Sequence, residues 1–283
     1  DALADIIVVN TCSFIQDAKE ESIETILEVA DHKQSGRCRM LIVSGCLPQR
    51  YQDELAEQLP EVDLFMGTSD APRIVELIER QLGLTETTTE ISTPDYLYDH
   101  STPRINSSPF YTSYIKIADG CSNHCSYCII PQLRGVLRSR SIDSVVAEAR
   151  ALAEKGVREI NLIAQDITAY GADREDGAAI EPLLRELVKI EKLDWIRLLY
   201  AYPDGIGEEL IDLIASEDKI CNYLDIPLQH IDDQILKQMN RRLDSAGVHN
   251  LLERLRQKIP DLTLRTSFIV GFPGESSAQF EQL

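Results

Sequence analysis

The chain has 283 residues, a formal net charge of −19 at pH 7, 43% hydrophobic residues and 27% charged residues. This composition is globular, and the length is enough for two ordinary domains or for one large barrel with a smaller unit. No apolar run approaches the ~20 residues that a membrane span requires. The acidity counts against binding of phosphate backbones, which needs Lys and Arg, and favours a basic protein partner. Solubility alone explains the same charge equally well.

Residues 1–83 alternate short apolar runs with amphipathic stretches. The runs predict strands over 5–10, 39–46 and 62–67, each followed by a helix. Alternation of strands and helices is typical of a parallel sheet that is covered on both faces. We therefore predict a small doubly wound α/β domain over residues 1–83.

Residues 84–112 are rich in Thr, Ser and Pro and have no helical period, which predicts a linker. From residue 113 the alternation resumes, with five strand–helix steps before the end of the chain. This pattern predicts an open or closed α/β barrel over residues 113–283.

The sequence "DGCSNHCSYCIIP" (119–131) holds three of the seven cysteines, spaced Cys-x3-Cys-x2-Cys. Cys121, Cys125 and Cys128 follow the first predicted strand of the barrel, at the rim where active-site loops gather. An odd number of cysteines argues against a disulfide framework and favours a reduced, cytoplasmic setting. Three thiols without a nearby fourth suit a 4Fe–4S cluster with one open iron, whereas zinc usually takes four ligands. A zinc site completed by His124 or by a distant residue is the alternative.

The spacing, with Tyr127 before the last cysteine, resembles the signature of the radical S-adenosylmethionine (SAM) enzymes. The stretches "YIKIADGCSNHCSYCIIPQLRGVLRSR", "INLIAQDITAYG", "YLDIPLQH" and "RTSFIVGFPGE" resemble successive motifs of the methylthiotransferases in that family. "VNTCSFIQDAKEESIETI" and "VSGCLPQRY" resemble their amino-terminal domain. The resemblance implies a partial (βα)-barrel, SAM bound at the open iron, and an external electron donor that triggers formation of a 5′-deoxyadenosyl radical.

The same resemblance implies that Cys12 and Cys46 bind a second 4Fe–4S cluster. In the family a third cysteine precedes the position of Asp1, and a small β-barrel follows the radical domain, so we expect a longer natural protein. Without the resemblance, a cysteine at a strand end is more often a small core residue. Cys38 and Cys221 match no ligand position and are expected to be ordinary thiols.

Five further residues are candidates for SAM binding. Tyr127 lies in the cysteine loop, and Gln165 and Asp166 end the second barrel strand, where family members hold the methionine ammonium. A helix cap is the alternative for Asp166. Gly271 and Gly274 would permit close approach of the adenosine, with a tight turn as the alternative.

Three arginines follow the cysteine loop, namely Arg134, Arg138 and Arg140. A guanidinium can pair with the SAM carboxylate through two parallel hydrogen bonds, and Arg138 is our candidate. A solvated basic stretch explains any one of them equally well. Gln229 and His230 end the fourth strand and are predicted to line the substrate pocket.

The family contains two substrate classes, an adenosine in transfer RNA and an aspartate of the small-subunit ribosomal protein S12. "TCSFIQDAKEESIETI" and "AQDITAYG" resemble the ribosomal-protein branch, whereas the transfer-RNA branch more typically has Gln-Asn where Gln165 and Asp166 stand. The acidic charge agrees, because ribosomal proteins are basic. We therefore predict methylthiolation of the aspartate β-carbon. Transfer-RNA modification and a non-catalytic iron–sulfur module that binds the ribosome are the alternatives.

Overall fold

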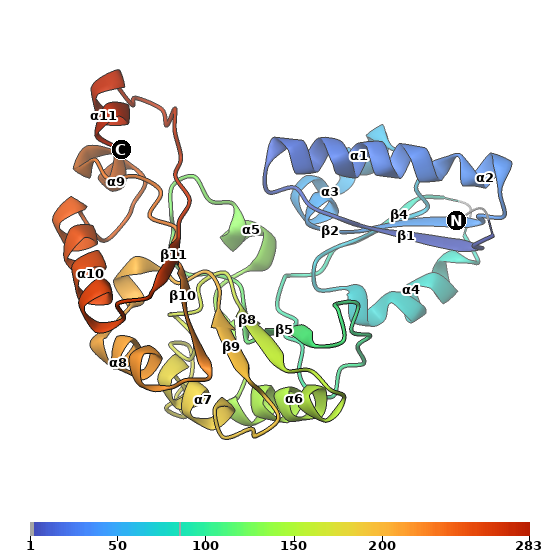
Figure 1. The fold of residues 1–283 in the computed structure, drawn as a ribbon. Coiled ribbons are helices and arrows are strands. Elements are labelled where there is room, and N and C mark those ends of the chain that lie inside the picture. The colour runs from blue at the N-terminus through green and yellow to red at the C-terminus, as the bar shows by residue number, and fades with distance from the viewer. Residues whose placement is uncertain (1–2, 85) are drawn as a thin grey trace. The chain divides into compact units, whose positions relative to one another are not determined.

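The computed structural model describes residues 3–84 and 86–283. The chain forms two compact units (Figure 1). The first unit contains the residues up to Tyr96 together with Ile129–Gly135, and the second unit contains Leu97–Cys128 and Val136–Leu283. Among the described residues, none of the helices has the length and apolar character needed to cross a membrane.

The first unit is built on a parallel sheet in the order β1-β2-β3-β4. Its strands are β1 (Ile6–Thr11), β2 (Met40–Gly45), β3 (Leu64–Met66) and β4 (Thr88–Glu90). Every residue of β2 is buried, because this central strand is covered on both faces. The continuous apolar run in the sequence is what such a strand requires.

Helices cover both faces of this sheet, as predicted. The helices are α1 (Gln16–Ala30), α2 (His32–Ser35), α3 (Cys46–Gln58), η1 (Ala71–Arg73) and α4 (Ile74–Gln81). Leu41 and Val43 of β2 pack in one cluster with residues of α1 and α3. Met40 and Ile42, on the other face of the same strand, pack with Leu77 of α4. Figure 1 shows α1 and α4 on opposite sides of the sheet.

Two features differ from the predicted boundaries. The segment 84–112 is not a linker throughout, because it contains β4, whose Thr88 hydroxyl donates to the Gln81 side chain of α4 at 2.5 Å. The strand is short and polar, so its sequence has no apolar run to reveal it. In addition, α5 (Ile130–Arg134) packs with the first unit although it directly follows the cysteine loop.

The second unit is a five-stranded parallel sheet in the order β11-β10-β9-β8-β5. Its strands are β5 (Thr112–Lys116), β8 (Glu159–Ile163), β9 (Trp195–Leu198), β10 (Ile220–Asp225) and β11 (Thr263–Arg265). A short antiparallel pair, β6 (Ala118–Asp119) and β7 (Arg138–Ser139), lies beside it. Because β5 and β11 stay unpaired with each other in the described chain, the barrel is open, one of the two predicted forms.

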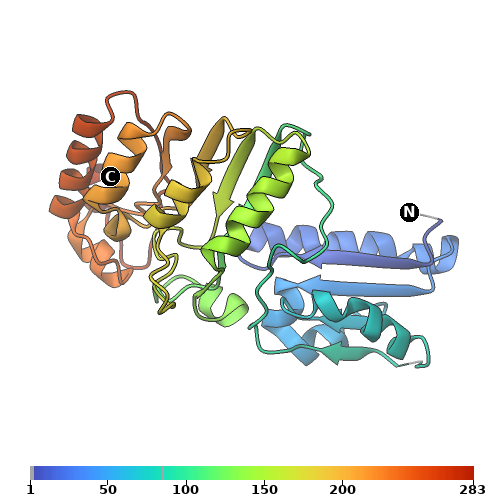
Figure 2. The same ribbon diagram turned by 90° about the horizontal axis from the view of Figure 1, so that it is seen from below.

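Helices cover the convex side of this sheet (Figures 1 and 2). They are α6 (Ile142–Glu154), α7 (Ile180–Leu187), α8 (Glu208–Ser216) and α10 (Ser245–Lys258), followed along the chain by α11 (Ser277–Gln282). The turns between them hold η2 (Pro203–Gly205) and α9 (Asp233–Gln238). The core forms where alternate strand residues such as Ile160 and Ile196 meet helix residues such as Leu184. The opposite, polar strand face stays open, and the carboxyl ends of the strands carry the loops considered next.

Candidate functional site

The cysteine loop leaves β5 at the carboxyl edge of the second sheet. Its base is held by the β6/β7 pair, in which Asp119 lies opposite Arg138. Its tip is held by α9: the backbone N–H of Ser126 donates to Met239 O at 3.2 Å and its hydroxyl donates to Gln238 O at 2.8 Å. Asn240 donates from its side chain to His124 O at 2.8 Å. The loop is thus fixed at its base and at its tip.

The thiols of Cys121, Cys125 and Cys128 are each half-buried. Burial raises the pKa of Cys121, and the nearby charges of Asp166, Cys128 and Cys125 add to the rise. Within residues 3–84 and 86–283, no three His, Cys, Asp or Glu side chains converge closely enough to hold one metal ion. In an iron–sulfur cube each thiolate binds a different iron.

Hydrogen-bond donors surround the sulfur of Cys125. The Nη1 atom of Arg241 lies 3.8 Å from Cys125 Sγ. Burial raises the pKa of Tyr202 to about 12 and also raises the pKa of Tyr127. A hydrogen bond with Cys125 contributes to the rise of both pKa values. Both phenols therefore remain protonated at neutral pH and can donate. Arg241 and Tyr202 were not predicted from the sequence, where neither stands in a recognisable motif.

Asp166 anchors the cysteine loop to the end of β8. Its Oδ2 accepts from Asn123 Nδ2, and its Oδ1 accepts from the Thr168 N–H at 3.0 Å, the Thr168 hydroxyl at 2.6 Å and the Ala169 N–H at 3.3 Å. The last three bonds are those of a local cap, the alternative interpretation of this residue. Asp166 also lines, with Cys121, a cavity of about 320 Å³ beside the loop.

Gln165 points its amide at the base of the loop. Its Nε2 donates to Asp119 Oδ1 at 3.1 Å, and Lys116 Nζ donates to Asp119 Oδ2 at 3.0 Å. The Oε1 of Gln165 is buried and has no partner among the described residues. An orphaned acceptor of this kind is costly unless a donor reaches it. It is therefore available to a cationic group of a ligand.

The profile of the radical SAM superfamily matches residues 115–283, which form nearly the whole of the second sheet and its helices. The chain belongs to the radical SAM superfamily. Membership implies a 4Fe–4S cluster and SAM. Residues 1–67 match a second profile, described as "Uncharacterized protein family UPF0004".

Curated relatives of this radical SAM chain carry the name "Ribosomal protein uS12 methylthiotransferase RimO". The protein from Syntrophotalea carbinolica is 63% identical over 283 residues, covering 100% of this chain and 62% of the relative. The protein from Geobacter sulfurreducens is 61% identical over 280 residues, covering 99% of this chain and 63% of the relative. The chain thus spans somewhat less than two thirds of the length of these relatives.

Solved structures of other radical SAM enzymes share the fold. The methyltransferase TsrM from Kitasatospora setae, with cobalamin and a [4Fe-4S] cluster bound, superposes with a TM-score of 0.72 at 16% identity, covering 99% of this chain and 61% of that one. The cobalamin-dependent radical enzyme OxsB, with aqua-cobalamin and SAM bound, gives a TM-score of 0.65 at 12% identity, covering 94% and 41%. At such identities the likeness concerns the fold alone.

The three arginines after the radical SAM loop have three different environments. Arg140 is buried and donates to Glu148 Oε2 at 2.6 Å and to Lys116 O at 2.9 Å, so it is part of the core. Arg138 is half-buried on β7, where its Nη1 donates to Val136 O at 2.9 Å. Arg134 lies in the first unit. Arg138 stays our candidate for the SAM carboxylate.

Cys12 and Cys46 follow neighbouring strands of the first unit. Thr11 and Gly45, the residues before them, are register partners in β1 and β2, so both cysteines lie at the carboxyl edge of the sheet, Cys12 before α1 and Cys46 as the first residue of α3. Cys12 is exposed and Cys46 is buried. The Nη2 atom of Arg134 lies 3.6 Å from Cys46 Sγ. An arginine thus lies beside the sulfur of Cys46 in the first unit, as Arg241 lies beside the sulfur of Cys125 in the second unit.

The segments around Gly271 and His230 form one turn structure. Gly271 and Gly274 have φ values of 74° and 87°, the left-handed conformation of a tight turn. Glu275 accepts from the Phe272 N–H at 2.9 Å and from His230 Nε2 at 3.3 Å. His230 is fully buried, and its place in a substrate pocket stays a prediction. Gln229 is half-buried beside it.

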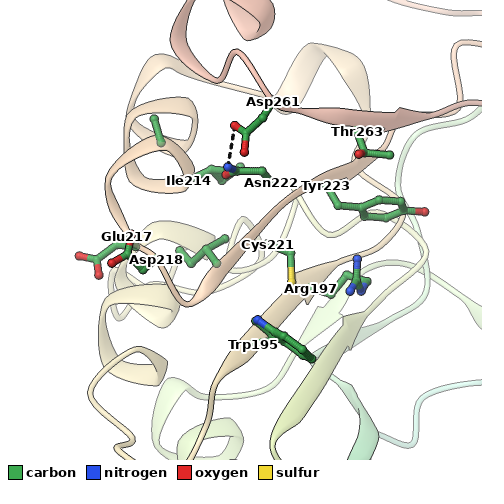
Figure 3. Close-up of a pocket in the computed structure, with 12 residues that line it drawn as sticks. Trp195, Arg197, Ile214, Glu217, Asp218, Cys221, Asn222, Tyr223, Asp261 and Thr263 are labelled. Atoms are coloured by element: carbon green, nitrogen blue, oxygen red, sulfur yellow. Dashed lines mark hydrogen bonds between the residues drawn. The ribbon is translucent and has the colours of Figure 1, made fainter.

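Another cavity lies at the other end of the strands. It has a volume of about 560 Å³ and is lined by the first residues of β9, β10 and β11, among them Trp195, Cys221 and Thr263. Figure 3 shows Cys221 above Trp195, and Asp261 accepting from Asn222. Because the cysteine loop leaves β5 at the carboxyl edge, this cavity is separate from the candidate site. Cys221 lies within β10 and Cys38 is buried, as ordinary thiols.

Proposed function

We propose that this protein is a methylthiotransferase that adds a methylthio group to the β-carbon of an aspartate in ribosomal protein uS12. The observation that carries the proposal is the identity of 63% over the whole chain to a relative named for this activity. The Cys-x3-Cys-x2-Cys loop at the carboxyl edge of a radical SAM sheet supports it. This chain spans 62% of that relative, and we propose the same activity for it.

Five cysteines would hold two 4Fe–4S clusters. Cys121, Cys125 and Cys128 would bind the first and leave one iron for SAM. Cys12 and Cys46 would bind the second, with a third cysteine from outside this chain. When bound, the first cluster and SAM supply the radical that breaks the C–H bond, and the second cluster supplies sulfur. The chain's own residues orient these groups and exclude water.

The residues around the cysteine loop are suited to hold SAM. The buried, unpartnered Oε1 of Gln165 is an acceptor for the methionine ammonium. Arg138 is proposed to meet the carboxylate, and Tyr127 to stand between SAM and Cys125. A Cβ added at Gly271 or Gly274 would meet no atom closer than 3.8 Å, so these turns leave room for the adenosine. Asp166 acts mainly by positioning the loop, since its carboxylate already accepts four hydrogen bonds.

Charge supports a protein substrate rather than RNA. The net charge of −19 would repel transfer RNA and attract a basic ribosomal protein. An external reductant must supply the electron for the reaction. These partners are proposed on charge and on the names of the relatives.

The test uses the anaerobically purified protein, reconstituted with iron and sulfide. We expect iron and sulfide for at least one cube, release of 5′-deoxyadenosine on addition of SAM and dithionite, and a mass increase of one methylthio group on uS12. Alanine at Cys121, Cys125 and Cys128 should abolish the release of 5′-deoxyadenosine and the mass increase, and should lower the iron and sulfide content by that of one cube. A protein that binds zinc instead of iron, or that releases no 5′-deoxyadenosine, would exclude a radical enzyme. Modification of transfer RNA with uS12 left unchanged would exclude the proposed substrate alone.

A further inference from the structure

Arg241 is held firmly beside the sulfur of Cys125. Its Nη2 donates to Pro227 O at 2.6 Å, and its guanidinium carbon lies 4.1 Å from the centre of the Tyr202 ring. The third contact is Nη1 to Cys125 Sγ at 3.8 Å, within the reach of a hydrogen bond to sulfur. The backbone oxygen of Pro227 and the ring of Tyr202 therefore fix the guanidinium, and its Nη1 atom faces the thiol of Cys125.

The contact is unusual because its two ends come from distant parts of the chain. Arg241 follows α9, and Cys125 lies in the loop after β5; the same α9 end pins the tip of that loop through Ser126. The loop would thus be held without Arg241. A core packing role does not explain why a half-buried cation is directed at a sulfur atom. An electrostatic role does.

A cation beside a ligand sulfur changes the charge balance of a cluster. A cube with three thiolate ligands is anionic, and it gains a further negative charge on reduction. Hydrogen bonds and positive charge near the sulfurs stabilise the reduced form more than the oxidised form, which raises the reduction potential. Arg is suited to this task because it is charged at any working pH and its planar fork holds several partners at once.

We propose that Arg241 is a positioning residue that donates to the Cys125 thiolate and raises the reduction potential of the cluster on Cys121, Cys125 and Cys128. This inference rests on the proposed function, because it requires that cluster to form. Tyr202 supports the guanidinium from below and adds a donor of its own. The electron that starts the reaction would then enter at a less negative potential than in a site without the arginine.

The test is a potentiometric titration of the reconstituted protein, followed by the electron paramagnetic resonance signal of the reduced cluster. Alanine at Cys12 and Cys46 removes the proposed second cluster from the signal. Relative to this background, Arg241→Met should lower the equilibrium constant for cluster reduction about tenfold, the scale of one charge-assisted hydrogen bond. For a one-electron couple this is a shift of about 59 mV to more negative potential.

Matched variants separate charge from packing. Arg241→Lys keeps the positive charge but cannot donate to Pro227 O and to Cys125 Sγ at the same time. Its reduction potential should therefore shift in the same direction as that of Arg241→Met, by a smaller amount. Tyr202→Phe keeps the aromatic face and should also cause a small negative shift. Arg185→Met is the control, because Arg185 is an exposed arginine that pairs with Glu209 on the helical side of the sheet. Its potential should equal that of the background.

The outcomes are distinguishable. If the background protein builds no cube, the proposed function fails and the inference fails with it. If Arg241→Met builds the cube at normal iron content and its potential equals that of the background, the inference alone is refuted. If Arg241→Met lowers iron content while the clusters that form keep the background potential, the residue is purely structural and the inference is also refuted.

Discussion

Replacement of Asp166 by alanine tests whether this buried carboxylate holds the cysteine loop in place. Asp166 is 4% exposed and accepts from two backbone N–H groups, one hydroxyl and one amide. The hydroxyl of Thr168 and the amide of Asn123 border the cavity beside the loop, so water can replace their lost acceptor. The two backbone N–H groups are less easily hydrated, and a buried donor left without an acceptor costs about 1–3 kcal/mol.

We therefore expect Asp166→Ala to lower the free energy of unfolding by about 2–4 kcal/mol. For a unit of this size, that corresponds to a fall in Tm of roughly 5–15 °C. Urea and thermal unfolding followed by circular dichroism measure the loss. In the folded variant, Cys121 should also react faster with iodoacetamide, because Asn123 no longer fixes its side of the loop.

The control is Asp194→Asn, which removes an exposed pair with Arg158 and should cost less than 1 kcal/mol. The reasoning is refuted if Asp166→Ala unfolds like the wild-type protein. A loss of SAM affinity at unchanged stability would show that the carboxylate binds the cofactor directly and that its hydrogen bonds to the loop are incidental.

Four other substitutions test the structure around the site. Glu148→Gln should destabilise by about 3–5 kcal/mol in urea titrations, because it leaves Arg140 charged and buried; a cost under 1 kcal/mol would contradict this. Gly171 and Gly271 both have a positive φ, but a Cβ at Gly171 would lie 1.9 Å from a backbone oxygen. Gly171→Ala should therefore lower Tm far more than Gly271→Ala. Equal losses of Tm would contradict this steric argument. A backbone N–H lowers the pKa of Glu275, so this carboxylate stabilises the fold above its unfolded pKa and stops doing so as pH falls through the lower, folded value. Glu275→Gln should flatten that acid dependence in urea titrations between pH 7 and pH 3, and an unchanged slope would show that the group is not responsible.

The strands that carry the site could be predicted because their buried faces demand apolar residues at regular positions. The run 39–46 gave β2, and the alternation from residue 113 gave the five strands of the open barrel. The position of the cysteine loop followed from the same pattern, since it comes directly after β5. β4 escaped because an edge strand of the sequence Thr-Thr-Glu offers no apolar signal, and its place is set by pairing with β3.

Residues whose role depends on a distant partner could not be predicted. Arg241 meets Cys125 across 116 positions of the chain, and nothing near either residue in the sequence indicates the contact. His230 has the same difficulty, because its hydrogen-bond partner Glu275 lies 45 residues later. The local sequence pattern thus identified the strands and loops that carry the cysteines. The environment of each sulfur is decided by tertiary contacts, which local pattern does not encode.

A glycine with positive φ precedes a cysteine in each unit, and the geometry of strand ends explains why. Gly45, with a φ of 105°, precedes Cys46, and Gly120, with a φ of 77°, precedes Cys121. A Cβ on Gly45 would lie 2.6 Å from the backbone oxygen of Thr11 on the neighbouring strand, so the chain can turn here only without a side chain. The turn ends the strand at once and starts the cysteine at the sheet edge. At the end of β2, the backbone conformation of Gly45 is therefore as much a requirement as Cys46 itself.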